Sequence, residues 1–166
     1  EEDIDILNDS LINFVKIIEK KFKRKISRLV GGGAAGGTAA GLHGFFGATL
    51  DSGFFILSDL IGLEKHIKGV DLIFTAEGKM DHQSIQGKLT GEIAKLGKNY
   101  SIPVIGLTGE LVGDRDNFYK NGFSGVFSIQ NGPMELYESL SYSSELLTDI
   151  TSRVLAFYKN SRELGI

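Results

Sequence analysis

The chain has 166 residues, of which 42% are hydrophobic and 23% charged, with a net charge of −3 and no cysteine. These values exclude a disordered chain, disulfide bonds and cysteine metal sites, and the nearly balanced charge predicts neither a nucleic-acid partner nor binding to an anionic membrane. No apolar run approaches the roughly 18 residues of a membrane span, and the lack of cysteine fits a cytoplasmic location, which we expect.

Glycine is unusually frequent, with 22 residues, which is about twice the usage of an average chain. Eight of the 22 fall between Gly31 and Gly47. There is no Gly-X-Y period and only two prolines occur, which excludes a collagen. The excess is therefore local to one part of a folded protein and needs a local explanation.

The first part of the chain is expected to be mostly helical. Apolar residues at spacings of three and four predict an amphipathic helix over residues 3–25. Residues 26–30 are a short strand or an entry segment, and residues 31–37 form a loop that opens onto a tightly packed helix. Residues 53–68 are typical of a helix that Gly62 interrupts.

The rest of the chain alternates short apolar strands with helices. The predicted strands are residues 70–75, 102–107 and 125–129, and the predicted helices are residues 89–100, 114–120 and 141–160. This alternation predicts an α/β fold, a parallel and doubly wound sheet of the flavodoxin-like or Rossmann-like kind with helices on both faces. Three strands are few for such a sheet, so either residues 26–30 and an unrecognised segment add to it or chain outside this sequence completes it.

Polar segments follow each of the three predicted strands, at residues 76–88, 108–110 and 130–133. Because the carboxyl ends of parallel strands meet at one edge, where such sheets bind ligands, we expect these segments to lie together. The longest segment, residues 76–88, exceeds the usual strand-to-helix connection of about 2–6 residues, and long connections are often functional. An ordinary exposed polar loop is the alternative.

Residues 76–88 combine carboxylates, lysines and neutral hydrogen-bonding groups. The polar residues concerned are Glu77, Lys79, Asp81, His82, Gln83, Ser84 and Lys88. Phosphoryl transfer uses this mixture, because carboxylates hold Mg²⁺ or accept a hydroxyl proton while lysines neutralise phosphate oxygens. The segment is therefore a candidate site for that chemistry.

The glycine-rich segment partly matches two nucleotide-binding motifs. Gly31-x-Gly33-x-x-Gly36 fits the dinucleotide-binding fingerprint, and Asp51 follows at the usual distance. A segment with so many glycines matches many patterns, and the residues before Asp51 are too few to form a second strand. Both points weaken the match to the dinucleotide-binding fingerprint. A P-loop is excluded, because Thr38 stands where that motif requires lysine.

A third interpretation of this segment is an anion-binding loop. Glycines let backbone N–H groups approach a phosphate or carboxylate at the start of a helix. The residues expected to do so are Gly31, Gly32, Gly33, Gly36 and Gly37. Small residues also permit close helix packing, and both explanations can hold together.

Several motifs occur in a fixed order along nearly the whole chain. They are residues 31–37, Thr75-Ala76-Glu77-Gly78-Lys79-Met80-Asp81-His82-Gln83-Ser84, Gly87-Lys88, Pro103-Val104-Ile105-Gly106-Leu107 and Gly132-Pro133-Met134. In this order they resemble the glycerate kinase family. The family usually has arginine where this chain has Lys79, which keeps the positive charge but loses the bidentate geometry.

The resemblance implies a kinase that phosphorylates D-glycerate with ATP and Mg²⁺ to give 2-phosphoglycerate. Family members are considerably longer, so it also implies that this chain is their C-terminal portion and needs the missing N-terminal part as its partner. Residues 1–66 would belong to a second α/β domain, and residues 67–166 would form the C-terminal part of the Rossmann-like domain. We expect the 166-residue chain alone to be inactive, and a homodimer is left open.

The resemblance also implies roles for the residues of the polar segment. Asp81, Glu77 and Lys79 form the expected catalytic set, with Asp81 as the base or metal-organising carboxylate. Asp81 and Glu77 are the candidate Mg²⁺ ligands. Lys79 and Lys88 would compensate the charges of the phosphate and of the glycerate carboxylate.

Substrate binding would fall to Gln83 and Ser84, which would orient it by hydrogen bonds, and to the amides of residues 31–37, which would bind an anion. Two rival functions stay open. One is an NAD(P)-dependent oxidoreductase that uses the fingerprint beginning at Gly31. The other is a sugar-acid binding module without catalytic activity.

Overall fold

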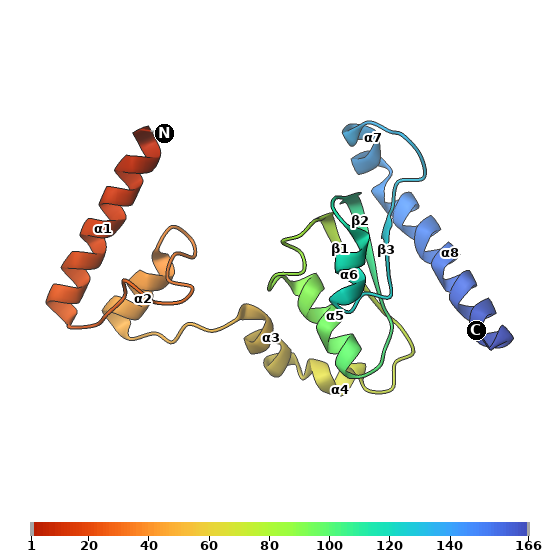
Figure 1. The fold of residues 1–166 in the computed structure, drawn as a ribbon, viewed down its shortest axis with the longest axis horizontal. Coiled ribbons are helices and arrows are strands. Elements are labelled where there is room, and N and C mark those ends of the chain that lie inside the picture. Colours follow the sequence, from red (N-terminus) through yellow and green to blue (C-terminus); the bar gives the residue numbers. More distant parts are fainter. Residues whose placement is uncertain (1, 166) are drawn as a thin grey trace. The chain divides into compact units, whose positions relative to one another are not determined.

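The computed structural model describes residues 2–165, which divide into two compact units between Leu57 and Ser58 (Figure 1). The expected domain boundary after residue 66 stays a prediction about the whole protein. None of the helices in the described residues is long and apolar enough to cross a membrane.

The first unit contains helices α1 and α2. Helix α1 (Glu2–Phe22) confirms the helix expected over residues 3–25, although it ends earlier, where Lys23 takes a left-handed conformation with φ of 59°. Helix α2 (Thr38–Phe46) confirms the helix expected after the glycine-rich loop. Residues 26–30 contain turns, so the first of their two expected conformations, a strand, is wrong.

Side-chain hydrogen bonds, in place of a strand, fix the chain after α1. The Glu19 carboxylate accepts hydrogen bonds from the backbone N–H groups of Ile26 (2.8 Å) and Ser27 (3.0 Å). These bonds, with that of Ser27 first, lower the pKa of Glu19 below its ordinary value. Arg24 donates to the carbonyl oxygen of Gly44 (2.9 Å) in the last turn of α2, where a cation is favourable.

Glycines and the large side chains of α1 meet where α2 and the loop before it pack on α1. The contacts pair Leu11 with Gly37, Phe14 with Gly41 and Ile18 with Gly44. These glycines recur at spacings of four and three, so they share one face of the helix and its entry. A Cβ atom on Gly44 would lie 2.5 Å from Cγ2 of Ile18, whose side chain is completely buried. Part of the glycine excess therefore serves close packing.

Replacing Gly44 by alanine tests this packing. We expect Gly44→Ala to lower the free energy of unfolding by about 1–3 kcal/mol, because the new methyl group overpacks the contact with Ile18. Gly53→Ala is the control, because Gly53 lies in α3 (Gly53–Ile61) with open space around its Cβ position, and it should be neutral or stabilising. Urea unfolding followed by circular dichroism measures both, and a Gly44→Ala chain as stable as the wild type would contradict the packing argument.

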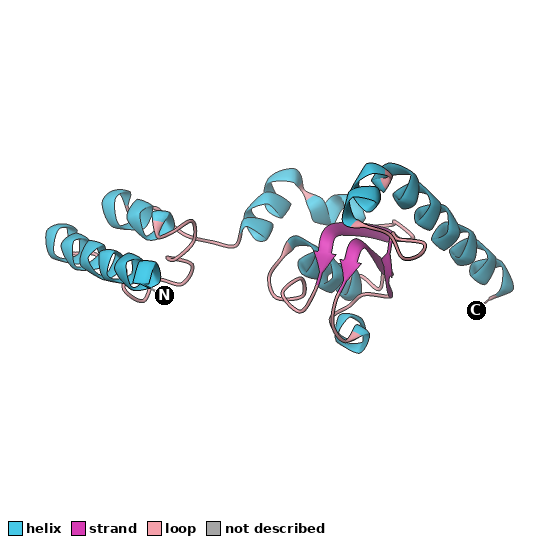
Figure 2. Cartoon of the chain, turned by 90° about the horizontal axis from the view of Figure 1, so that it is seen from above, coloured by secondary structure: helices cyan, strands magenta, loops and turns pink. Residues whose placement is uncertain are grey.

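The second unit is built on a parallel sheet of three strands. These are β1 (Ile73–Met80), β2 (Val104–Leu111) and β3 (Gly125–Ser128), in the spatial order β1-β2-β3. The strands lie side by side in Figure 2. The parallel α/β sheet expected from the sequence is confirmed. Before it, Gly62 (φ 65°) separates α3 from α4 (Leu63–Ile67), as its position in the helical pattern predicts.

Helices cover both faces of this sheet. On one face, α5 (Leu89–Asn99) and α6 (Arg115–Lys120) pack over a core that includes Val104 and Phe118. On the other face, α8 (Ser143–Leu164) packs over Ile105, the next residue along β2. Neighbouring residues of one strand thus enter two separate cores, which explains why the strands are apolar throughout.

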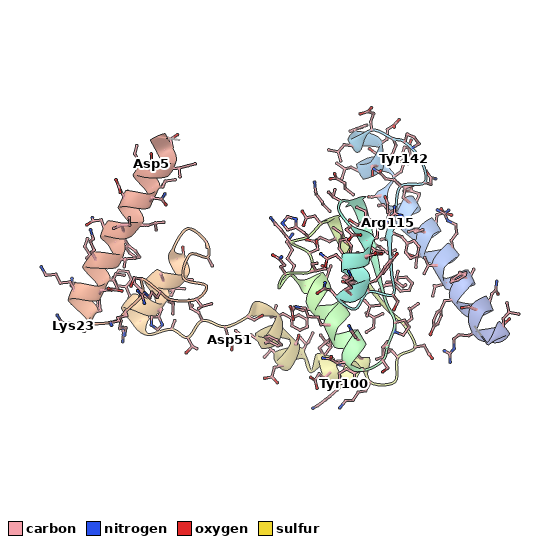
Figure 3. The ribbon with its side chains drawn as sticks, viewed as in Figure 1. Asp5, Lys23, Asp51, Tyr100, Arg115 and Tyr142 are labelled. Carbon is pink, nitrogen blue, oxygen red and sulfur yellow. The ribbon has the colours of Figure 1, made fainter. Side chains whose placement is uncertain are left out.

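Polar contacts fasten the ends of these helices far from the candidate site. At the end of α5, the Tyr100 hydroxyl donates to Oε2 of Glu64 in α4 (2.9 Å; Tyr100 is labelled in Figure 3). In α8, the Tyr158 hydroxyl donates to the backbone oxygen of Asp71 (2.7 Å), and Arg162 forms an ion pair with the Asp71 carboxylate. These contacts hold α4 to the end of α5, and α8 to the residues just before β1.

The element boundaries differ from expectation in two places that affect the site. Strands β1 and β2 continue beyond the apolar runs that predict them, to Met80 and Leu111. Residues 76–80 of the first predicted polar segment and all of residues 108–110 are therefore strand. A separate short helix, α7 (Leu136–Ser141), precedes α8, which begins at Ser143 and ends at Leu164. Because the strands extend in this way, the backbone that carries the polar side chains of β1 and β2 is held by hydrogen bonds of the sheet.

Candidate active site

A cleft of about 910 Å³ lies at the carboxyl edge of the sheet, and we call it the edge cleft. It is lined by residues 76–79 of β1, residues 107–110 of β2, Ile129 and Gln130 after β3, and residues of α7 and α8. All three segments expected at this edge therefore contribute to one cavity. Its walls on the α7 and α8 side are largely apolar, whereas Glu77, Lys79 and Glu110 place charges on the strand side.

Glu77 is held by two partners. Its Oε1 accepts from Nζ of Lys88 (3.0 Å), and its Oε2 accepts from the hydroxyl of Thr90 (3.2 Å). Lys88 lies at the N-cap of α5 and Thr90 in the first turn of that helix. The sequence predicts Glu77 and Lys88 as site residues but not their pairing, and it misses Thr90 entirely. The only sequence signal for Thr90 is its place as the second residue of the helix that follows the polar segment.

Lys79 pairs with Glu110 across the sheet. Its Nζ lies 3.1 Å from Oε2 of Glu110, and the two residues are direct partners in the parallel register of β1 and β2. Both side chains are more than half exposed, so the pair contributes little to stability. Glu110 adds a carboxylate to the edge that no motif singles out, because strand register decides which residues face each other.

Asp81 begins the turn that follows β1. Its Oδ1 accepts from the backbone N–H of Gln83 (2.8 Å), and its own N–H donates to Oγ of Ser84 (3.1 Å). The hydrogen bond from Gln83 lowers the pKa of Asp81 below its ordinary value. Desolvation is the next largest effect and opposes this shift, whereas Lys88, His82 and Ser84 add to it. Asp81 is therefore ionised at neutral pH and is a weak proton acceptor.

The two residues expected to orient substrate differ in exposure. Gln83 is exposed, whereas the side chain of Ser84 is completely buried and its hydroxyl supports the backbone of Asp81. In this turn Gln83 is accessible from solvent, whereas Ser84 stabilises the turn from its buried side. The substrate contact of each stays a prediction.

Two glycines face each other where β1 and β2 reach the edge cleft. A Cβ atom on Gly109 would lie 2.8 Å from the backbone oxygen of Gly78. Beyond these glycines, Met80 and Leu111 pack into the core on the α5 side, although the strict two-residue alternation would send them to the opposite face from Ile73. The strand ends therefore turn at the glycines and anchor in the core.

The glycine-rich segment belongs to the first unit. No neighbouring atom lies within 4 Å of the Cβ positions of Gly31, Gly33 and Gly36, so their backbone can be approached. The N–H groups of Gly32 and Gly37 already donate to the carbonyl oxygens of Leu29 and Gly33. Anion binding by this segment stays a prediction, and its support rests on the three open glycines.

The dinucleotide interpretation lacks its structural context. The fingerprint requires a strand that leads into the glycine loop, but residues 26–30 form turns. This observation weighs against the oxidoreductase alternative.

Metal-binding clusters are also absent: nowhere in residues 2–165 do three or more histidine, cysteine, aspartate or glutamate side chains gather as ligands. An all-protein metal site is therefore missing from the described residues. Mg²⁺ in kinases commonly binds through one or two carboxylates and completes its shell with phosphate oxygens and water, so the carboxylates of the edge remain compatible with it.

The profile of the Glycerate kinase family matches residues 1–159. The chain belongs to the glycerate kinase family. It is 38% identical over 123 residues to "Glycerate 2-kinase" of Escherichia coli K12, covering 74% of this chain and 32% of that one. It is 29% identical over 161 residues to "Glycerate kinase" of Bacillus subtilis 168, covering 97% of this chain and 42% of that one.

A solved glycerate kinase structure has the same fold. The crystal structure of a protein of Salmonella typhimurium LT2, described as a glycerate kinase 2, is 33% identical with a TM-score of 0.72. The match covers 98% of this chain and 42% of that one. The chain therefore spans less than half the length of these glycerate kinase relatives, which agrees with the expectation that family members are considerably longer.

Proposed function

We propose that the full-length protein transfers the γ-phosphoryl group of ATP to D-glycerate in a Mg²⁺-dependent reaction and releases 2-phosphoglycerate. The observation that carries the proposal is the carboxyl edge of the sheet in a chain of the glycerate kinase family. Glu77, Lys79 and Glu110 line the edge cleft there. Lys88, the partner of Glu77, and Asp81 lie in the segment that follows β1. The relative from Escherichia coli is named a glycerate 2-kinase, which supports the position of the phosphate in the product. A cytoplasmic location and an association with the missing N-terminal part belong to the same proposal.

The lysines would supply the charge compensation. Lys79 and Lys88 each hold a carboxylate at 3.1 and 3.0 Å, so both ammonium groups are already positioned at the edge. A phosphate or carboxylate of a substrate would replace Glu110 or Glu77 as their partner, at little net cost because these pairs are partly solvated. Phosphoryl transfer asks for such positioning and charge stabilisation more than for covalent chemistry by the protein.

Asp81 is the better candidate for a metal contact. Both oxygens of Glu77 accept hydrogen bonds, whereas Asp81 uses Oδ1 for Gln83 and its Oδ2 has no hydrogen-bond partner within residues 2–165. The carboxylate is ionised, and its lowered pKa favours an orienting or metal-binding role over that of a base. When bound there, Mg²⁺ would neutralise the charge of the transferred phosphoryl group.

Activity of the full-length protein tests the proposal. We expect ADP release that depends on D-glycerate, ATP and Mg²⁺, and a product that phosphorus NMR identifies as 2-phosphoglycerate. The 166-residue chain alone should show no turnover. Binding of glycerate without ADP release would favour the binding module, and binding of NAD without ATP would favour the oxidoreductase.

A further inference from the structure

Thr90 is a buried residue that contacts Glu77, one of the residues lining the edge cleft. Its side chain is 2% exposed, and its hydroxyl oxygen lies 3.2 Å from Oε2 of Glu77 and 3.3 Å from the backbone oxygen of Ser84. A hydroxyl has one proton to donate, and a carboxylate is the stronger acceptor. The proton of Thr90 therefore goes preferentially to Glu77.

The same hydroxyl also lies near the backbone oxygen of Ser84. Ser84 in turn accepts the backbone N–H of Asp81 with its buried side-chain hydroxyl. The contacts thus connect the carboxylate of Glu77, through Thr90 and Ser84, to the backbone N–H of Asp81. It links strand β1, the first turn of α5 and the turn after β1.

The fold brings α5 unusually close to this turn. A Cβ atom on Gly91 would lie 2.5 Å from the backbone oxygen of Ser84 and 2.8 Å from Cα of Ile85. Only glycine at this position lets the helix approach the turn so closely. The approach in turn puts the hydroxyl of the preceding residue, Thr90, within reach of Ser84.

We propose that Thr90 is a positioning residue that fixes the carboxylate of Glu77 for the reaction. The inference rests on the kinase function proposed above. Glu77 has a second partner, Lys88, but that side chain is exposed to solvent and can be reached by substrate, whereas Thr90 is buried. Thr90 therefore keeps one oxygen of Glu77 in place while Lys88 changes partner. A hydrogen bond to a charged group, lost from such a position, corresponds to about a 10- to 100-fold loss in rate.

The test compares two replacements of Thr90 in the full-length protein. Thr90→Val keeps the shape and removes the hydroxyl, so we expect kcat for glycerate phosphorylation to fall about 10- to 100-fold. Thr90→Ser keeps the hydroxyl and should remain within about threefold of the wild type. Thr148→Val is the matched control, because Thr148 lies exposed in α8 with its hydroxyl on a backbone oxygen, and its kcat should not change.

A double-mutant cycle separates positioning from general damage. In a Glu77→Gln background, Thr90→Val should cost much less than in the wild type, because the carboxylate it orients is gone. Equal losses in both backgrounds, or a Thr90→Val protein with normal kcat, would overturn the proposal. If Thr90→Val shows no thermal unfolding transition and is therefore not folded, the cycle is measured with Thr90→Ala. Equal losses in both backgrounds, or a normal kcat, would then overturn the proposal in the same way. A wild-type protein without glycerate-dependent ADP release would instead refute the kinase function itself.

Discussion

Replacing Asp81 by asparagine should lower kcat of the full-length protein at least about 100-fold. Asparagine keeps an oxygen that can accept the backbone N–H of Gln83 (2.8 Å in the wild type), so the turn is preserved while the negative charge is lost. The loss then reports on the charge, which the lowered pKa of Asp81 maintains at neutral pH. Steady-state kinetics with D-glycerate and ATP, with thermal unfolding to confirm the fold, provide the measurement.

Asp114 offers a closely matched control for this substitution. Its Oδ1 accepts a hydrogen bond from the backbone N–H of Asp116 (3.0 Å). Oδ1 of Asp81 likewise accepts from the backbone N–H two residues later, that of Gln83. Asp114 caps α6 and lies outside the polar segment at residues 76–88 that contains Asp81. Asp114→Asn should therefore keep kcat near the wild-type value. If Asp81→Asn retained comparable turnover, Asp81 would have no catalytic or metal-binding role.

Replacing Gly91 by alanine should damage both the stability and the activity of the second unit. The added Cβ would meet the backbone of Ser84 at 2.5 Å and of Ile85 at 2.8 Å, and backbone cannot move aside as a flexible side chain can. We expect the free energy of unfolding to fall by about 1–3 kcal/mol or more. Because the turn after β1 would be displaced from α5, kcat should fall at least about 10-fold in the protein that remains folded.

Gly53→Ala, the control introduced above, also controls for the general effect of adding a methyl group. The Cβ position of Gly53 has open space, and the residue lies outside the three polar segments and does not line the edge cleft. This variant should be at least as stable as the wild type and should match it in kcat. Chemical denaturation measures the free energy of unfolding of both variants, and steady-state kinetics measures their kcat. A Gly91→Ala protein with wild-type stability would refute the close approach of α5.

The sequence predicts the elements of this fold well where the apolar pattern is regular. The strands around Ile73, Ile105 and Val126 and the helix from Leu89 follow from continuous apolar runs and from three- and four-residue spacing. The extension of β1 through Gly78 could not be predicted, because glycine and charged residues are rare in strands. Pairing with β2 overrides that preference.

The candidate site was predictable as a segment but not as a set of contacts. Residues 76–88 are recognisable from their chemistry, and Asp81 and Glu77 stand out within them. Glu110 belongs to a segment expected at this edge, but its pairing with Lys79 depends on strand register. Thr90 lies outside the expected segments and reaches Glu77 because α5 docks on the turn after β1. Such contacts join residues that the local pattern treats as independent.

Both strands turn at Gly78 and Gly109, and Met80 and Leu111 anchor their ends in the core. This anchoring affects the free energy of ligand binding. Groups on an anchored strand lose their conformational entropy when the chain folds, whereas groups on a free loop lose it when a ligand binds. The charged residues of the edge are thus ordered in advance. More of the interaction free energy with a ligand is then available for affinity and orientation.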